Sequence, residues 1–238
     1  MVNGSLDFLD MIKNGAGSRA AVRKSRQEEK QTGQPDNKPE NKPENKPEVR
    51  KAPANKMIAV IDTETNWRDE VMTIGVALAD QGTLQCVDRR YYILEPECRI
   101  GGMYSGVIGK CEDRPVTGMR DQVLGEIRKY LEACGVSKIF AYNGKFDVMH
   151  LPELSGYEWY DIMRLAAYRQ FNNSIPQTAE CCKTGRLKRN YGVEPIMRML
   201  TGNSSYFEVH NAVMDAVDEL KIMELLGHGI EKYECARI

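Results

Sequence analysis

Asp62 and Glu64 end an apolar stretch that begins at Met57 and is rich in β-branched residues. Such a stretch is typical of a buried strand, and side chains two residues apart on a strand point to the same face of the sheet. The two carboxylates are therefore expected to converge. Because paired carboxylates at the end of a buried strand repel each other and lose hydration, they need a cation between them, usually a divalent metal. The pattern predicts metal chemistry, with further ligands from elsewhere in the chain.

Two later stretches contain acids that suit this role. Asp147 follows the apolar stretch 138–143, and sheets of this class bind ligands beyond the carboxyl ends of their strands. His210 precedes an amphipathic pattern over 211–226 that contains Asp215. Inside one helix, a separation of five residues would turn the two side chains about 140° apart. We therefore expect His210 to lie on the loop before the helix, from which it can reach the same side as Asp215.

Taken together, these stretches resemble the motifs of the DEDDh (DnaQ-like) 3′–5′ exonucleases, a superfamily with the ribonuclease-H-like fold. The resemblance covers residues 57–226, with the motifs in the family's order. Where many relatives have a histidine directly before the motif asparagine, this chain has Tyr142, at a position that does not hold metal in the family. The matching positions are Asp62-x-Glu64, Asn143-x-x-Phe146-Asp147 and His210-x-Ala212-x-x-Asp215-Ala216.

The resemblance implies an enzyme that hydrolyses phosphodiester bonds at the 3′ end of single-stranded DNA or RNA. Two divalent cations, Mg²⁺ or Mn²⁺, would assist, since both prefer oxygen ligands and keep several waters. His210 would be the general base, because an imidazole with a pKa of about 6.5 is largely neutral at pH 7. By resemblance, the metal ligands and catalytic acids would be Asp62, Glu64, Asp147 and Asp215. Contacts with the terminal nucleotide would come from Thr63, Thr65, Asn143 and Phe146.

Two other sets of side chains are candidates for substrate contacts. Trp67 is suited to stack on a base, since stacking tolerates any sequence and is worth about 1–3 kcal/mol per base, although a place in the core is an equal alternative. A basic cluster ahead of the last motif is suited to hold phosphates, and a solvated loop is its alternative. The cluster comprises Lys183, Arg186, Lys188 and Arg189.

Two alternative functions remain open at this point. The first is a catalytically inert nucleic-acid-binding module with the same fold, against which the complete set of four acids and a histidine argues. The second is an adaptor recruited by a protein partner through residues 5–12. Within that apolar segment, Leu6-Asp7-Phe8-Leu9 loosely resembles the short motifs that bind the bacterial sliding clamp. A segment that folds back on its own domain or stays disordered is the simpler interpretation.

The chain divides into three regions by composition. Residues 17–56 have only two large aliphatic side chains and contain three tandem Asn-Lys-Pro-Glu repeats, which predicts a disordered, semi-extended linker. Eleven Lys/Arg against six Asp/Glu give this region a net charge of +5, so the remainder carries −6 of the total of −1. A nucleic-acid partner is compatible with that distribution but is not implied by it. The predicted organisation is a short apolar segment at 1–16, which is a candidate for docking, the linker at 17–56 and an exonuclease domain at 57–238.

Composition places the chain among ordinary globular proteins. The chain has 238 residues with 42% hydrophobic and 28% charged content, enough for one core. The absence of a long apolar run and of a signal peptide predicts a cytoplasmic protein without a membrane partner. Seven cysteines without a C-x-x-C pair favour a reducing compartment. A zinc site from Cys98, Cys111, Cys181 and Cys182 is a minor alternative, since their spacing matches no usual ligand pattern.

The elements that must position these residues follow from the hydrophobic patterns. The stretches 71–79 and 84–94 are predicted strands that extend the first one into a meander. Further strands at 138–143 and 157–161 then alternate with helices. The expected fold class is α/β, ribonuclease-H-like, with a mixed five-stranded sheet and helices on both faces. The predicted helices cover residues 117–134, 145–153, 162–171, 187–200 and 211–226.

Overall fold

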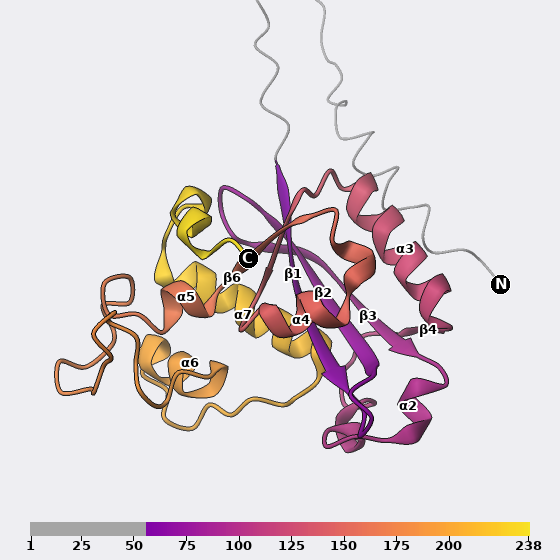
Figure 1. Cartoon of the computed structure of the whole chain (residues 1–238), viewed down its shortest axis with the longest axis horizontal. Coiled ribbons are helices and arrows are strands. Elements are labelled where there is room, and N and C mark those ends of the chain that lie inside the picture. Colours follow the sequence, from indigo (N-terminus) through magenta and orange to yellow (C-terminus); the bar gives the residue numbers. More distant parts are fainter. Residues whose placement is uncertain (1–55) are drawn as a thin grey trace, which may run out of the picture. The chain divides into compact units, whose positions relative to one another are not determined.

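The structure is a computed structural model that describes residues 56–238 (Figure 1). The predicted docking segment and all but the last residue of the predicted linker lie outside the described residues. The described part of the chain is an α/β domain built on a mixed sheet of six strands, in the order β4-β3-β2-β1-β5-β6. The α/β, ribonuclease-H-like architecture predicted from the sequence is confirmed.

The sheet begins with an antiparallel meander and ends with parallel strands. β1 pairs with β2, and β2 with β3, in antiparallel register, whereas β4, β5 and β6 each run parallel to a neighbour. The sheet has one strand more than the five predicted, because β4 is only three residues long and too short for an alternating pattern to be recognised. The strands are β1 Met57–Thr65, β2 Val71–Asp80, β3 Cys86–Leu94, β4 Val116–Gly118, β5 Lys138–Ala141 and β6 Glu158–Asp161.

The helices differ from the predicted ones mainly at their ends. α5 is a single turn rather than a helix over 162–171, and α6 begins at Val193 rather than at residue 187. Leu187 instead bridges to Cys181, because residues 181–187 form an extended loop that returns on itself. The helices are α2 Glu97–Ile100, α3 Arg120–Ala133, α4 Lys145–His150, α5 Met163–Ala166, α6 Val193–Thr201 and α7 Ala212–Leu226, with 3₁₀ turns η1 Ser105–Val107, η2 Pro152–Leu154 and η3 Ile230–Ala236.

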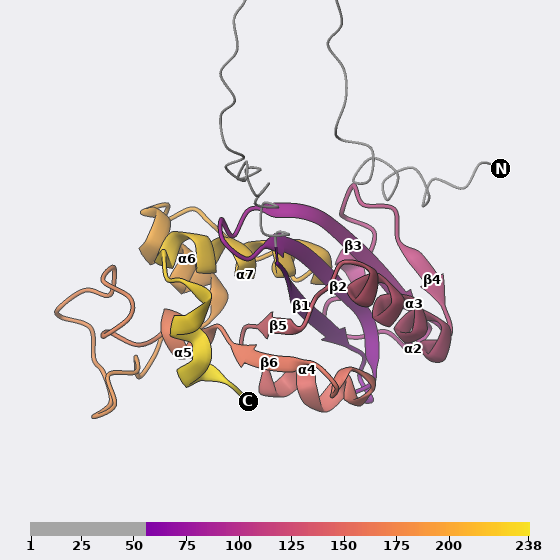
Figure 2. The same ribbon diagram turned by 90° about the horizontal axis from the view of Figure 1, so that it is seen from above.

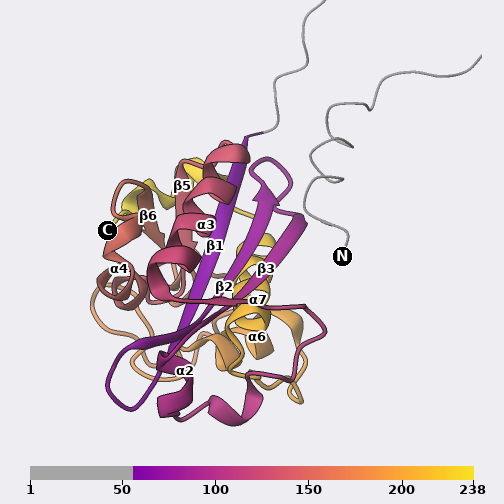
Figure 3. The ribbon, with the colours of Figure 1, turned by 90° about the vertical axis from the view of Figure 1, so that its right-hand side faces the viewer.

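The sheet is buried on both faces by different helices. α7 covers one face, where Val60 of β1 packs in the same cluster as Ala216 and Leu220. α3 covers the other, where Ile61 packs with Ile127. Figures 2 and 3 show α3 and α7 on opposite sides of the sheet. Because side chains alternate along β1, its even-numbered residues face α7 and its odd-numbered residues face α3.

A glycine in β2 lets α7 lie directly on the sheet. Gly75 pairs with Asp62 of β1, and a Cβ atom at residue 75 would lie 2.0 Å from the carbonyl oxygen of Ala212. Any side chain at this position would push away the first turn of α7. The close approach brings the start of α7 over the end of β1, where the two acids stand.

No helix in the part of the chain that the structure describes is long and apolar enough to cross a lipid bilayer.

Candidate active site

The end of β1 extends past its neighbour in the sheet. β5 pairs with β1 at Ala59 and Val60 only, so residues 62–65 continue beyond the end of β5. Asp62 and Glu64 share the face that α7 covers, as the alternation of β1 requires. The edge of β1 at these residues is therefore open to side chains from the elements that follow β5.

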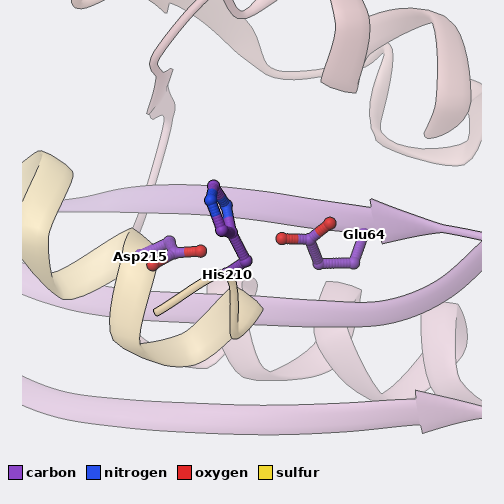
Figure 4. Close-up of side chains that lie close together, drawn as sticks. All are labelled: Glu64, His210 and Asp215. Carbon is purple, nitrogen blue, oxygen red and sulfur yellow. The ribbon is translucent and has the colours of Figure 1, made fainter. Parts of the chain in front are cut away.

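Glu64, His210 and Asp215 come together from three separate segments (Figure 4). Each offers a ligand atom, and these atoms all lie within 4.8 Å of one another. Glu64 comes from β1 and Asp215 from the first turn of α7. His210 lies on the loop two residues before α7 begins, with a φ of 61°. This backbone conformation turns the imidazole back toward Asp215.

Asp62 and Asp147, the other two predicted metal ligands, lie outside this group of three but close enough for the charges of the acids to affect one another. Asp147 is buried at the start of α4, and its Oδ1 accepts a hydrogen bond of 2.8 Å from the hydroxyl of Thr63. In the part of the chain that the structure describes, the buried Oδ2 of Asp62 has no hydrogen-bond partner. Burial raises its pKa well above the ordinary value, and the nearby carboxylates of Glu219 and Asp147 raise it further.

The remaining carboxyl groups are perturbed in the same direction. Burial, with help from Asp215, raises the pKa of Glu64 to about 8. Burial and Glu208 raise the pKa of Asp215 to about 8. Burial also raises the pKa of Asp147 to about 7, against the opposing effect of the Thr63 hydrogen bond. A concentration of buried acids with raised pKa values is a common mark of a functional site.

His210 is perturbed in the way that favours its neutral form. Partial burial lowers the pKa of the imidazole below its ordinary value, against the opposing charge of Glu194. At pH 7 the ring is therefore mostly uncharged and able to accept a proton.

The acids fit divalent cations. Two buried oxygens, Asp62 Oδ2 and Asp215 Oδ1, have no hydrogen-bond partner within the described domain. Among the ion pairs of residues 56–238, none includes any of the four predicted ligands. Buried carboxylates without a positive partner are costly, and hard divalent cations bind such oxygens. The seven cysteines are free thiols and none belongs to the group of three close ligands.

The raised pKa values predict how the stability of the metal-free protein depends on pH. The folded state binds protons on these carboxyls more tightly than the unfolded chain, so the free energy of unfolding falls as the pH rises from about 4 to about 8. In EDTA, thermal unfolding is expected to shift to lower temperature across this range. Adding Mn²⁺ should raise the Tm more at pH 8 than at pH 5.5. A Tm that is flat or rising with pH in EDTA would contradict this prediction.

The sequence analysis missed three residues of the site. Glu219 is fully buried one turn after Asp215, and its Oε2 accepts the Tyr142 N–H at 3.0 Å. Its helical spacing from Asp215 is a signal that indicates a shared face. Glu208 is half-buried, and its pKa is raised to about 7 by burial and by Asp218. Tyr104 stacks on the ring of His210, and no local pattern in the sequence indicates that contact.

The four side chains predicted to contact the terminal nucleotide differ in their burial and in their neighbours. Thr63 is buried and its hydroxyl supports Asp147. Thr65 is half-buried at the end of β1. Asn143 is exposed and lines a cavity of about 370 Å³ to which none of the five predicted catalytic residues contributes. Phe146 is 37% exposed, and its ring packs on His150. Their contacts with a nucleotide stay a prediction.

The two other candidates for substrate contacts, Trp67 and the basic cluster, lie at the surface. Trp67 is 69% exposed, which excludes the alternative of a core residue. In the basic cluster, Arg186 lies over the ring of Tyr191, and Arg189 is 3.7 Å from Glu180. Both arginines therefore have partners within the protein.

Comparison with known proteins gives matches in structure alone. No family model matches the sequence, and no curated protein matches it either. Escherichia coli exonuclease I in complex with a dA16 oligonucleotide is 12% identical, with a TM-score of 0.51 over 75% of this chain and 42% of that chain. The same enzyme with a 5cy-dT13 oligonucleotide is 10% identical, with a TM-score of 0.51 over 76% of this chain and 42% of that chain.

The described domain has the ribonuclease-H-like fold of these exonucleases. The nuclease domain of 3'hExo, a DEDDh family member bound to rAMP, is also similar, at 15% identity and a TM-score of 0.49 over 71% of this chain and 90% of that chain. This chain spans about two fifths of the length of the exonuclease I chains it matches. Within this exonuclease fold, β1, α4 and α7 supply the four predicted acids.

Proposed function

We propose that residues 57–238 form a metal-dependent 3′–5′ exonuclease domain that acts on single-stranded nucleic acid. The observation that carries this proposal is the meeting of Glu64, His210 and Asp215 beside Asp62 and Asp147 in an exonuclease fold, where the four acids have no positive partner among residues 56–238. The oligonucleotides in the similar exonuclease I structures support a single strand as the substrate. An inert binding module would not need a set of buried acids that destabilises the metal-free domain.

Four carboxylates would hold two divalent cations: those of Asp62, Glu64, Asp147 and Asp215. An all-oxygen set suits Mg²⁺ or Mn²⁺. When bound, such ions activate a water molecule and neutralise charge on the leaving 3′-oxygen. The hydroxyl of Thr63 holds Asp147 in place for this role. Such supporting hydrogen bonds orient a ligand and tune its affinity.

His210 would accept the proton of the attacking water. The imidazole is only half-buried and its pKa is lowered, so a free ring nitrogen is present at pH 7. Glu64 and Asp215 lie within reach of that ring and keep the base next to the acids that would hold the water. General-base catalysis of this kind typically contributes about 10²- to 10⁴-fold to the rate.

The 3′ end of the strand would approach over the exposed side chains around the end of β1. Trp67 lies two residues after the end of β1, and Phe146 lies on the first turn after Asn143. Both present an aromatic face on which a base can stack. Only a terminal nucleotide free of its complement can lie flat on such faces and reach Asp62 and Glu64, which favours single strands and frayed ends.

The proposal is tested with 5′-labelled single-stranded oligonucleotides of matched DNA and RNA sequence. With Mg²⁺ or Mn²⁺ we expect a ladder that shortens one nucleotide at a time from the 3′ end, and no shortening in EDTA. A matched duplex with blunt ends should shorten more slowly. No shortening of either strand type with either metal would refute the exonuclease. The ratio of DNA to RNA rates then shows whether the site uses the 2′-hydroxyl.

A further inference from the structure

His210 has a backbone conformation that needs external support. Its φ of 61° lies in the left-handed region, which residues with a Cβ atom rarely adopt. Its backbone N–H donates to the carboxylate of Asp215 in the first turn of α7, which holds the backbone but leaves the side-chain torsions of His210 free. A contact with the ring itself can therefore determine where the imidazole points.

The ring of Tyr104 supplies such a contact. The Tyr104 and His210 rings are stacked, with centroids 4.0 Å apart and 17° between their planes. Tyr104 is half-buried and directly precedes the 3₁₀ turn η1. A parallel aromatic face restricts rotation of the imidazole while leaving both ring nitrogens at its edge free.

The next residue, Asn211, ties the same two segments together. Its side chain is 1% exposed, and its Nδ2 donates to the carbonyl oxygens of Val107 at 3.0 Å and Ile108 at 3.3 Å. Two consecutive residues of the loop before α7 thus bind residues 101–108, which we name the brace. A buried amide that donates to two carbonyls holds the backbone on both sides of the contact.

The brace itself is held against the end of β1. The Trp67 N–H donates to the carbonyl oxygen of Gly101 at 3.0 Å. A Cβ atom at residue 102 would lie 2.5 Å from the carbonyl oxygen of Thr65, so Gly102 permits direct backbone contact. The brace therefore contacts both the strand that carries Glu64 and the loop that carries His210.

We propose that Tyr104 is a positioning residue that holds the His210 imidazole beside Glu64 and Asp215, with Asn211 anchoring the brace. The inference rests on the proposed exonuclease function and specifies how its general base is oriented. The ring face of Tyr104 positions the imidazole by stacking on it, and the Tyr104 hydroxyl has no part in this contact. A side chain without an aromatic face leaves the imidazole free to rotate away from the water it must deprotonate.

Three substitutions separate the ring from the hydroxyl. In single-turnover assays with Mn²⁺, Tyr104→Leu and Tyr104→Ala are expected to lower the cleavage rate about 10- to 100-fold, since small misplacement of a catalytic group is enough for such losses. The apparent substrate affinity should stay within about threefold. Tyr104→Phe should restore the wild-type rate to within about threefold. A loss in Tyr104→Phe as large as in Tyr104→Leu would overturn the stacking role.

A double-mutant cycle shows whether Tyr104 acts through His210. In the His210→Ala background, Tyr104→Leu should cause no further loss, because the group that it positions is gone. Multiplicative losses from the two substitutions would overturn the inference. Tyr157→Ala is a matched control, since Tyr157 is also half-buried but packs against the α3 face of the sheet. Its cleavage rate should equal that of the wild type.

A measurement without substrate separates this inference from the exonuclease proposal. The chain has three histidines, so the ring protons of His210 are assigned in NMR spectra by their loss in His210→Gln. Stacking on Tyr104 should shift these protons upfield, the shift should persist in Tyr104→Phe, and it should disappear in Tyr104→Leu. If the wild-type protein lacks the upfield shift, the proposed stacking of Tyr104 on His210 is refuted. If the upfield shift is present but the protein cleaves no strand, the stacking of Tyr104 on His210 is supported and the exonuclease function is refuted.

Discussion

Asp62→Asn is expected to lower the rate of 3′ shortening by more than about a thousandfold, which corresponds to a loss of about 4 kcal/mol of transition-state stabilisation. Asn has the shape of Asp but lacks the charge that holds a divalent cation. Asp62 stands at the centre of the acids, because Glu219, Asp147, Asp215 and Glu64 all raise its pKa. Its buried Oδ2 has no hydrogen-bond partner among residues 56–238. Loss of this carboxylate therefore removes the most central ligand.

The same substitution should not damage the fold. Without metal, Asp62→Asn removes a buried negative charge from a repulsive cluster, so its Tm in EDTA at pH 8 should equal or exceed that of the wild type. Asp121→Asn on α3 is the matched control, because Asp121 is exposed and should tolerate the change with normal activity. Cleavage by Asp62→Asn within tenfold of the wild-type rate would contradict the two-metal site. A strongly lowered Tm would show that Asp62 has a structural role.

His210→Ala is expected to slow cleavage about 10²- to 10⁴-fold, the range typical of a lost general base. The imidazole is the only uncharged proton acceptor in the group of three close ligands, and burial favours its neutral form. Single-turnover rates at saturating Mn²⁺ measure the effect of the substitution on chemistry, without product release. His210→Gln should be equally slow, because an amide of similar size has no basic nitrogen at pH 7.

Metal affinity decides between the two roles that His210 can have. Its ligand atom lies within 4.8 Å of those of Glu64 and Asp215, so the structure also allows it to contact an ion. If His210 is the base, the Kd for Mn²⁺ measured by calorimetry should change by less than about threefold, whereas removal of a ligand or of its support typically costs 10- to 100-fold. A large loss of Mn²⁺ affinity in His210→Ala would reassign the residue as a ligand. His228→Ala is the matched control, because His228 lies just after the end of α7 and His210 just before its start. Its affinity for Mn²⁺ should equal that of the wild type.

The local parts of this site follow from the sequence by itself. Asp62 and Glu64 share a face because alternation along a strand is a property of the backbone, whatever the surroundings. The pattern over α7 likewise predicts which of its side chains are buried, and it places Asp215 within the first turn. The order of strands and helices was predicted for the same reason, since periodicity extends over enough residues to be recognised. The three-residue strand β4 and the late start of α6 were not, because β4 is defined only by its pairing with β3, and Arg186 and Leu187 are held in extended bridges to Tyr168 and Cys181.

The meeting of these parts was decided by the tertiary structure. The close approach of α7 depends on Gly75, which leaves room for the carbonyl of Ala212. The orientation of His210 depends on its left-handed backbone and on the Tyr104 ring, which comes from a segment with no periodic pattern. Glu219 is held in the site by the residue that follows β5, because the Tyr142 N–H donates to its Oε2. Residue types and strand geometry thus determined which groups are candidates for the chemistry, whereas long-range packing determined the distances between them, since contacts between remote segments leave no local signature.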